Sequence, residues 1–413
     1  MRRPSENIVT STLSNGLRAV HLHLPGSAVG CTGLYVRAGS RNEESDRYGL
    51  AHFVEHTIFK GTSHRSASRI INRMEAVGGE LNAYTTKEET VVYSTFPTGN
   101  LDRATELIAD LATASVFPSD ELDKERDVVA DEIDSYLDSP ADAVYDDFED
   151  LLFAGSPLGH NILGTHKTVD TFDSADCRNF VSRHYKAADM VAFYSGPVTA
   201  SKVFANFERR FAVIPAGYEE QRIVTEPPVV ASFNECRIIP SHQAHYIVGA
   251  RIDGYLSPRR AATALLSNIL GGPGMNSLLN VELRERRGLV YSVEASTTLF
   301  SDCGLLTVYF GCDPEDARKC RAIVDRTIRR IADDGLSRRS LDAAKKQYLG
   351  QLVIASENRE NSTLSAARQL LWRNRVITRD ENEQMIADIS CDDIIEAARQ
   401  LVNPSSLVMT PSV

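Results

Sequence analysis

The chain has 413 residues, of which 42% are hydrophobic and 24% are charged, a composition typical of folded globular proteins and not of disordered or low-complexity chains. Lysine and arginine number 45 against 56 acidic residues, so the formal net charge is −11. We therefore expect no binding to nucleic acid or to an anionic membrane surface, because both select for basic patches. At roughly 150 residues per domain, the length predicts two or three domains.

The N-terminal residues show no apolar segment of the kind found in secretory signals, and no run approaches the roughly 18 apolar residues of a membrane-spanning helix. The seven cysteines are scattered and include no C-x-x-C pair, which favours reduced thiols over a disulfide framework. We expect a cytoplasmic protein, with a processed periplasmic form as the open alternative.

The two halves of the chain repeat one order of predicted elements, judged from the hydrophobic period of two in strands and of three to four in helices. In the first half we expect strands at about 17–24, 33–38, 81–86, 90–96 and 190–194, and helices at about 47–60, 66–77, 101–115, 119–134 and 201–211. In the second half we expect strands at about 245–252, 291–298 and 305–311, and helices at about 258–270, 314–332 and 337–355, with a further helix ending at Arg287.

This repetition predicts an α+β protein made of two homologous α/β domains, each a mixed, largely antiparallel sheet packed by helices. The segment 214–233 contains three prolines and has no amphipathic period, so it is the expected linker. The predicted domains are therefore 1–213, which carries the candidate metal site, and 234–413, which lacks it.

A short motif, H-x-x-E-H, lies inside the predicted helix near residue 50. His52 and His56 are four positions apart and therefore project from one helical face. Two imidazoles at that spacing can bind one zinc ion, and Glu55 beside them can reach a water on the metal without coordinating it. The open alternative is a surface helix that carries these side chains by chance.

A catalytic zinc needs a third protein ligand and an open position for water. The predicted helix from Ser119 offers Glu125 and Glu132, which are seven positions apart and so lie on one face. Glu132 follows His56 by 76 positions. The alternative is a solvated acidic stripe that includes both glutamates and their acidic neighbours: Asp120, Glu121, Asp127 and Asp131.

In combination, the H-x-x-E-H helix and the glutamate 76 positions later resemble the inverted zinc metalloproteases, the family of pitrilysin, insulysin and the mitochondrial processing peptidase, and in particular its short bacterial members. The resemblance runs from about Asn15 to Leu407. The segments that carry it outside the motif are 49–51, 59–62, 78–85, 125–129 and 283–293.

The resemblance implies roles for the residues of the first half. His52, His56 and Glu132 would bind one zinc ion per chain, and Glu55 would be the catalytic base. Glu125 would be a catalytic carboxylate that orders a zinc ligand or the metal-bound water.

The resemblance also implies how substrate is bound. Asn82 and Ala83 would lie in an edge strand that pairs with the peptide substrate through main-chain hydrogen bonds. Arg284 and Tyr291, which match the arginine–tyrosine pair of the family, would bind the substrate carbonyl or the oxyanion formed from it.

The second half provides a comparison from within the chain. If the halves are copies, Glu125 aligns with Ala344 and Glu132 with Gln351, and the helix at about 258–270 contains no histidine. We therefore expect the metal site in the first half alone.

The resulting hypothesis is a zinc metalloendopeptidase that hydrolyses peptides or unfolded polypeptide segments in an enclosed chamber. Because the chain has about half the length of the long pitrilysin-like proteins, it is expected to act as a homodimer, or as a heterodimer with a related chain. Two alternatives stay open. One is a non-catalytic structural subunit of the same fold, and the other is a zinc hydrolase of another class.

Overall fold

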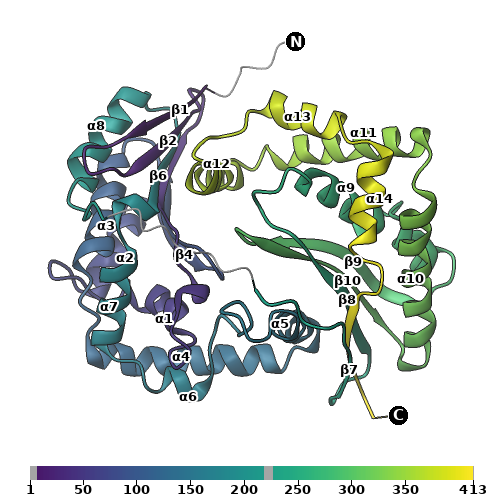
Figure 1. Cartoon of the computed structure of the whole chain (residues 1–413). Helices are drawn as coiled ribbons and strands as arrows, with labels where there is room; N and C mark the ends of the chain where they lie inside the picture. The colour runs from purple at the N-terminus through teal and green to yellow at the C-terminus, as the bar shows by residue number, and fades with distance from the viewer. Residues whose placement is uncertain (1–6, 218–226, 413) are drawn as a thin grey trace. The chain divides into compact units, whose positions relative to one another are not determined.

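The computed structural model describes residues 7–217 and 227–412, and the chain folds into two compact units. Within the described residues, unit 1 comprises 7–133, 161–217 and 356–377, and unit 2 comprises 134–160, 227–355 and 378–412. Each unit contains one β-sheet with helices on both faces (Figure 1). The predicted α+β class with two similar sheet-and-helix domains is confirmed.

The sheet of unit 1 has the strand order β1-β2-β6-β3-β5-β4. Its strands are β1 (Asn7–Thr12), β2 (Arg18–His23), β3 (Val29–Val36), β4 (Glu80–Thr85), β5 (Thr90–Pro97) and β6 (Met190–Gly196). The pair β2 and β6 is parallel and the other pairs are antiparallel. Because β5 is the one partner of β4 among the described strands, β4 forms one edge of the sheet.

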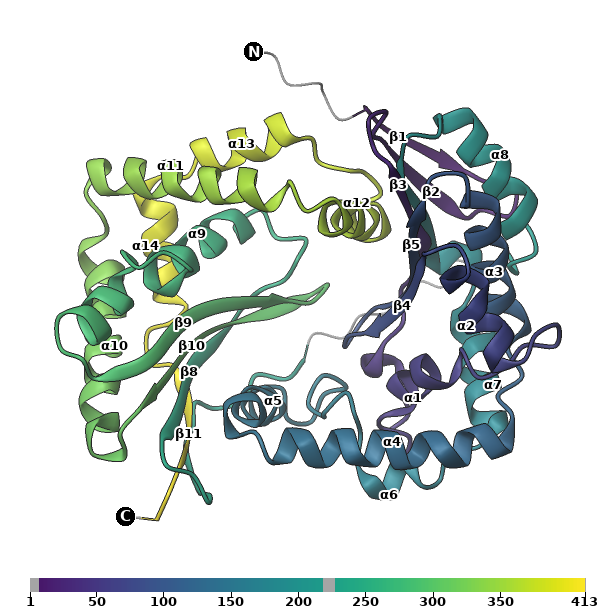
Figure 2. The same ribbon diagram turned by 180° about the vertical axis from the view of Figure 1, so that it is seen from behind.

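Helices cover both faces of this sheet (Figure 2). The helices of unit 1 are α1 (Leu50–Thr57), α2 (Ala67–Glu75), α3 (Leu101–Ala114), the larger part of α4 (Ser119–Leu137), α6 (His166–Val169), α7 (Ser174–His184), α8 (Ala200–Phe211) and α12 (Arg359–Arg373), with the 3₁₀ turns η1 (Ser40–Asn42) and η2 (Ala187–Asp189). The main core joins Leu34 of β3 to Phe53 of α1 and Leu107 of α3. On the opposite face, α12 packs Ala367 and Leu370 against Val20 of β2.

The sheet of unit 2 has the order β7-β11-β8-β10-β9. Its strands are β7 (Asn234–Ile238), β8 (Ala244–Asp253), β9 (Val290–Leu299), β10 (Cys303–Cys312) and β11 (Ser405–Thr410). The pair β7 and β11 is parallel and the others are antiparallel. This pattern repeats that of β2-β6-β3-β5-β4 in unit 1, which agrees with the duplication expected from the sequence.

The helices of unit 2 are α5 (Pro140–Leu152), α9 (Arg260–Gly271), α10 (Ala317–Asp334), α11 (Arg338–Ala355), α13 (Arg379–Ala387) and α14 (Cys391–Arg399), with the turns η3 (Asn280–Glu285) and η4 (Pro314–Asp316). The helix expected to end at Arg287 is the short π-helical η3, which stops two residues earlier. Gly288 follows with φ +60°, a left-handed conformation that ends the helix.

The compact units differ from the contiguous domains expected from the sequence. Helix α5 belongs to the first half of the chain but packs its Val144 and Phe148 on the sheet of unit 2. Helix α12 belongs to the second half but packs on the sheet of unit 1. The hydrophobic pattern shows that a helix has an apolar face and does not say which sheet that face covers. Of the expected linker, 218–226 lie outside the described residues, and Ile214 is part of the core of unit 1.

Across the described residues, no helix combines the length and the apolar character needed to cross a membrane.

Candidate metal centre

Helix α1 begins at a constrained point. Gly49 precedes it with φ +100°, and a Cβ there would lie 2.7 Å from the carbonyl oxygen of Leu163, so only glycine fits. Phe53 and Val54 of α1 are fully buried in the core of unit 1. This packing fixes the helix and leaves His52 and His56 on one side of it, with their rings edge to face and the ring centroids 4.5 Å apart.

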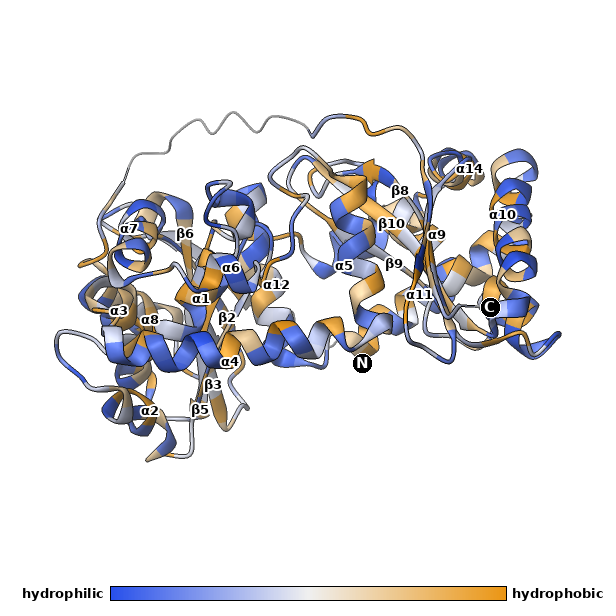
Figure 3. Cartoon of the chain, turned by 90° about the horizontal axis from the view of Figure 1, so that it is seen from below, coloured by the Kyte–Doolittle hydropathy of each residue, from blue (hydrophilic) through white to orange (hydrophobic). Residues whose placement is uncertain are grey.

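Helix α4 supplies the third side chain. Leu122, Val129 and Ile133, which are seven and four positions apart and so lie on one helical face, are buried in the same core. Figure 3 shows α4 as a mostly hydrophilic helix with short hydrophobic stretches. Glu132 lies beside the buried row, and its Oε2 is 3.7 Å from His52 Nε2 and 3.3 Å from His56 Nε2.

One ligand atom from each of these three residues lies within 4.8 Å of the other two. Two imidazole nitrogens and one carboxylate oxygen form a donor set that suits a catalytic zinc, which takes three protein ligands and keeps one position open. Burial, followed by repulsion from His56, lowers the pKa of His52 to about 3, so its imidazole is neutral and offers a lone pair near pH 7. The residues present therefore fit a divalent metal.

Glu125 and Glu132 have different environments, although both lie on α4. Glu125 is buried, and its Oε1 is 3.0 Å from His56 Nδ1 while its Oε2 is 2.5 Å from Lys60 Nζ. Burial alone would raise the pKa of Glu125, but the hydrogen bonds from His56 and Lys60 outweigh it and hold the pKa below its usual value. Glu125 thus fixes the ring of His56, as carboxylates beside metal-binding histidines generally do.

The acidic-stripe alternative does not describe these two glutamates. The side chains of Asp120, Asp127 and Asp131 are exposed, whereas Glu125 is buried and Glu132 is half-buried. Asp120, Asp127 and Asp131 lie along a different face of α4, and Glu121, the fourth residue of the predicted stripe, is half-buried.

Glu55 lies next to His56 and is half-buried. Its carboxylate accepts hydrogen bonds from the hydroxyl and the backbone N–H of Thr85, the last residue of β4. Burial is the largest influence and raises the pKa of Glu55, with a further contribution from Glu132. A carboxylate with a raised pKa is suited to accept a proton near neutral pH.

The remaining predicted residues lie on two different units. Asn82 and Ala83 are on β4, the edge strand whose last residue bonds to Glu55. Arg284 and Tyr291 are in unit 2 and both are exposed. The Tyr291 hydroxyl donates to Asp313 Oδ1 at 2.9 Å.

Unit 2 has a polar contact where the duplication would predict a second metal site. Gln351 of α11, which aligns with Glu132, accepts a hydrogen bond of 2.7 Å from Asn268 of α9. An amide pair replaces the carboxylate and imidazoles, and among the described residues the His52, His56 and Glu132 group alone has metal-binding geometry.

Two residues at the site were not identified from the sequence. Lys60 is four positions after His56, a spacing that places it near the same helical face, but lysine after a helix is common at surfaces. Thr85 ends an edge strand, and its contact with Glu55 depends on the packing of β4 on α1.

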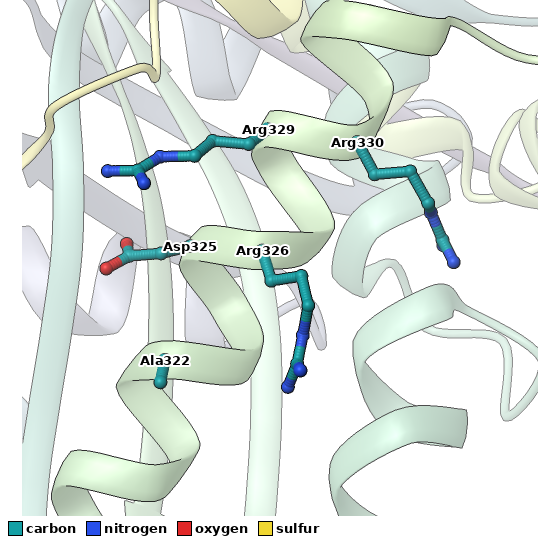
Figure 4. A pocket seen from close by; sticks show the side chains of 5 residues that line it. All are labelled: Ala322, Asp325, Arg326, Arg329 and Arg330. Atoms are coloured by element: carbon teal, nitrogen blue, oxygen red, sulfur yellow. The ribbon is translucent and has the colours of Figure 1, made fainter.

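A separate hollow of about 450 Å³ lies on unit 2 along α10 (Figure 4). It is lined by Ala322, Asp325, Arg326, Arg329 and Arg330. It contains none of the predicted site residues.

Comparison with known proteins places these features in a family. The model of the insulinase family of peptidases (peptidase family M16) matches residues 18–166, and that of the peptidase M16 inactive domain matches residues 171–348. An uncharacterized zinc protease of Streptomyces coelicolor is 32% identical over 409 residues, covering 97% of this chain and 89% of the relative. An uncharacterized zinc protease of Bacillus subtilis is 30% identical over 392 residues, 94% of either chain.

Solved structures share the fold. A protease from Helicobacter pylori superposes with a TM-score of 0.90 at 21% identity, covering 98% of this chain and 100% of the other. A structure from Pseudomonas fluorescens described as a peptidase M16 inactive domain gives a TM-score of 0.91 at 18% identity, covering 98% and 99%.

Proposed function

The chain belongs to the insulinase family of peptidases (peptidase family M16), and from that premise we propose that it is a zinc endopeptidase whose metal is held by His52, His56 and Glu132. The observation that carries the proposal is the convergence of these three side chains, with ligand atoms within 4.8 Å of one another. The names of the two relatives, both zinc proteases, support zinc as the metal.

The metal would polarise the scissile carbonyl and acidify the attacking water. Glu55 takes a proton from that water and returns it to the leaving amine, which is the role of a general base followed by that of a general acid. Its raised pKa and its hydrogen bonds from Thr85 support this role, because the first favours proton uptake and the second restricts the carboxylate to few orientations. Glu125 keeps His56 oriented through the 3.0 Å contact with Nδ1.

The peptide substrate would bind along β4. This strand is the free edge of its sheet, so its outward N–H and C=O groups can pair with an extended peptide at Asn82 and Ala83. Because Thr85 at the end of β4 bonds to Glu55, a peptide paired with β4 would run toward the catalytic base. Main-chain pairing accepts many sequences, which suits unfolded polypeptides.

Arg284 and Tyr291 would stabilise the oxyanion that forms during attack. We propose that two chains enclose the substrate in a chamber, as a homodimer or a heterodimer with a related chain, and that this pair acts on the substrate held by the other chain. One chain contains both parts of the machinery, which supports self-association. Mixing Glu55→Gln protein with Arg284→Ala protein would restore activity if the pair acts in trans, and would leave the mixture inactive if it acts in cis.

The proposed function is tested with an internally quenched peptide whose two ends are blocked. Wild-type protein should cleave it, a chelator should stop cleavage, and added zinc should restore it. The Glu55→Gln variant should bind zinc as the wild type does and cleave more slowly by a factor on the order of 10²–10⁴, because it lacks the general base. Cleavage at the wild-type rate by this variant would contradict the role of Glu55.

A further inference from the structure

We propose that Glu43 is a positioning residue for the metal site, which fixes the first turn of α1 and through it the imidazole of His52. The inference rests on the proposed zinc site and assigns a role to a residue outside the H-x-x-E-H motif.

The two histidines of the site are held in different ways. His56 has its Nδ1 on Glu125 at 3.0 Å, and Glu125 is bound in turn by Lys60. His52 Nδ1 is buried and has no hydrogen-bond partner among the described residues. Metal-binding histidines are commonly oriented by a hydrogen bond on the second ring nitrogen, and His52 lacks one. The direction of its ring must therefore come from the packing around it and from the backbone that carries it.

That backbone is held by one carboxylate. Glu43 Oε2 accepts the N–H of Gly49 at 2.9 Å, and Glu43 Oε1 accepts the N–H of Ala51 at 2.7 Å. These donors are among the first N–H groups of a helix, which have no partner inside the helix. The N-cap residue of α1 is a glycine without a side chain, so it cannot supply the usual cap. Glu43 replaces that cap from outside the helix and binds the residue immediately before His52.

The opposite side of the same turn is held by close backbone packing. A Cβ on Gly49 would lie 2.7 Å from the carbonyl oxygen of Leu163, and a Cβ on Gly164 would lie 2.2 Å from the carbonyl oxygen of Tyr48. Two glycines thus let the backbone of 163–164 press against the start of α1. The carboxylate of Glu43 and this contact together leave the turn that carries His52 little freedom to rotate.

Burial disfavours the charged form of Glu43. Burial raises the pKa of Glu43 to about 8, against the opposing influence of the two N–H donors and of Lys87. Glutamine keeps nearly the same shape and one acceptor oxygen and carries no charge, so burial imposes no penalty on it of the kind that it imposes on the carboxylate. A residue kept for positioning and not for stability should therefore tolerate glutamine in the fold while losing function.

The test compares Glu43→Gln and Glu43→Ala with a control that removes a cap of the same kind. The control is Asp173→Ala. One carboxylate oxygen of Asp173 accepts the N–H groups of Ala175 and Asp176 at the start of α7, which carries none of the three metal-binding residues. For each full-length protein the zinc dissociation constant is measured by competition with a chromogenic chelator, and the melting temperature is measured without metal.

We expect the Glu43 variants to raise the zinc dissociation constant by about tenfold, the lower end of the effect of removing a residue that orients a metal ligand. Glu43→Gln should melt at or above the wild-type temperature, and excess zinc should restore its cleavage activity. Asp173→Ala should melt lower and bind zinc normally.

Zinc affinity unchanged in both Glu43 variants would overturn the inference, as would an equal loss of affinity in Asp173→Ala. Failure of both Glu43 variants to fold would show that Glu43 serves the fold alone and would also overturn it. If the wild type itself binds no zinc, the proposed function fails, and the inference fails with it. Failure of the inference alone can be distinguished from failure of the proposed function, because the wild-type protein still binds zinc in the first case and does not bind it in the second.

Discussion

Replacing Glu125 with glutamine isolates the contribution of the buried carboxylate behind His56. Glu125 is 6% exposed, and its two oxygens bind His56 Nδ1 at 3.0 Å and Lys60 Nζ at 2.5 Å. The variant keeps the shape of the side chain and removes its charge. A hydrogen bond to a charged group contributes about 1.5–3 kcal/mol, and each 1.4 kcal/mol changes an equilibrium constant tenfold. Zinc affinity should therefore fall roughly 10- to 100-fold.

The assay is chelator competition at pH 7.5, with circular dichroism as a check on folding. Asp127→Asn is the matched control, because it makes the same charge change on the exposed face of α4. The control should bind zinc within about twofold of the wild type, since exposed charges interact weakly through water. A Glu125→Gln dissociation constant as close to wild type as that of the control would refute the argument that Glu125 orients His56.

Three further predictions concern the stability of unit 1. The unfolding of unit 1 is followed by the fluorescence of Trp372 on α12, the single tryptophan of the chain. Removing zinc with a chelator should lower the free energy of unfolding by about 2.7 kcal/mol, compared with protein in free zinc at a hundred times the dissociation constant. A urea midpoint that is the same with and without zinc would contradict metal binding by the folded state. Asp110→Asn should cost about 1.5–3 kcal/mol at pH 7, because Asp110 accepts hydrogen bonds from Thr62, His64 and Arg65. Burial would raise the pKa of Asp110, but these bonds outweigh it and hold the pKa below its usual value. As the pH falls, the carboxyl of the unfolded chain therefore binds its proton before that of the folded chain. The stabilisation by Asp110 is complete above about pH 4 and is lost as the pH falls below that value. A loss of unfolding free energy in Asp110→Asn that is equal at pH 7 and pH 3 would refute this. Glu89→Ala should cost about 3 kcal/mol, since this buried carboxylate binds Tyr35, Arg368 and Trp372 and ties α12 to the sheet. A change below 1 kcal/mol in urea unfolding would show that apolar packing alone holds α12.

The sequence was sufficient to predict the helices that carry the candidate site, because local periodicity determines them. His52 and His56 share a face through the four-residue spacing, and Glu132 was identified by its position in the family pattern. The spacing of Glu125 and Glu132 does not predict their different environments, because the two residues are seven positions apart and so lie on the same side of one acidic helix. Burial on α4 distinguishes them: Glu125 lies within the row that packs on the core, and Glu132 lies beside it.

Contacts between distant segments were beyond the reach of periodicity. Helix α5 of the first half packs on the sheet of unit 2, and helix α12 of the second half packs on the sheet of unit 1. The sequence period shows that each helix has an apolar face but not which sheet that face covers. The bonds from Gly49 and Ala51 to Glu43 join a side chain to backbone groups six and eight positions later, and no common capping motif has that spacing. Neither feature leaves a local pattern.

The central claim is that His52, His56 and Glu132 hold one zinc ion per chain. X-ray diffraction from crystals of the zinc-loaded protein, recorded on both sides of the zinc absorption edge, tests it most directly. We predict one strong anomalous peak per chain, within about 2.0–2.2 Å of a nitrogen from each histidine and an oxygen of Glu132. A peak elsewhere, or none at these three side chains, would contradict it.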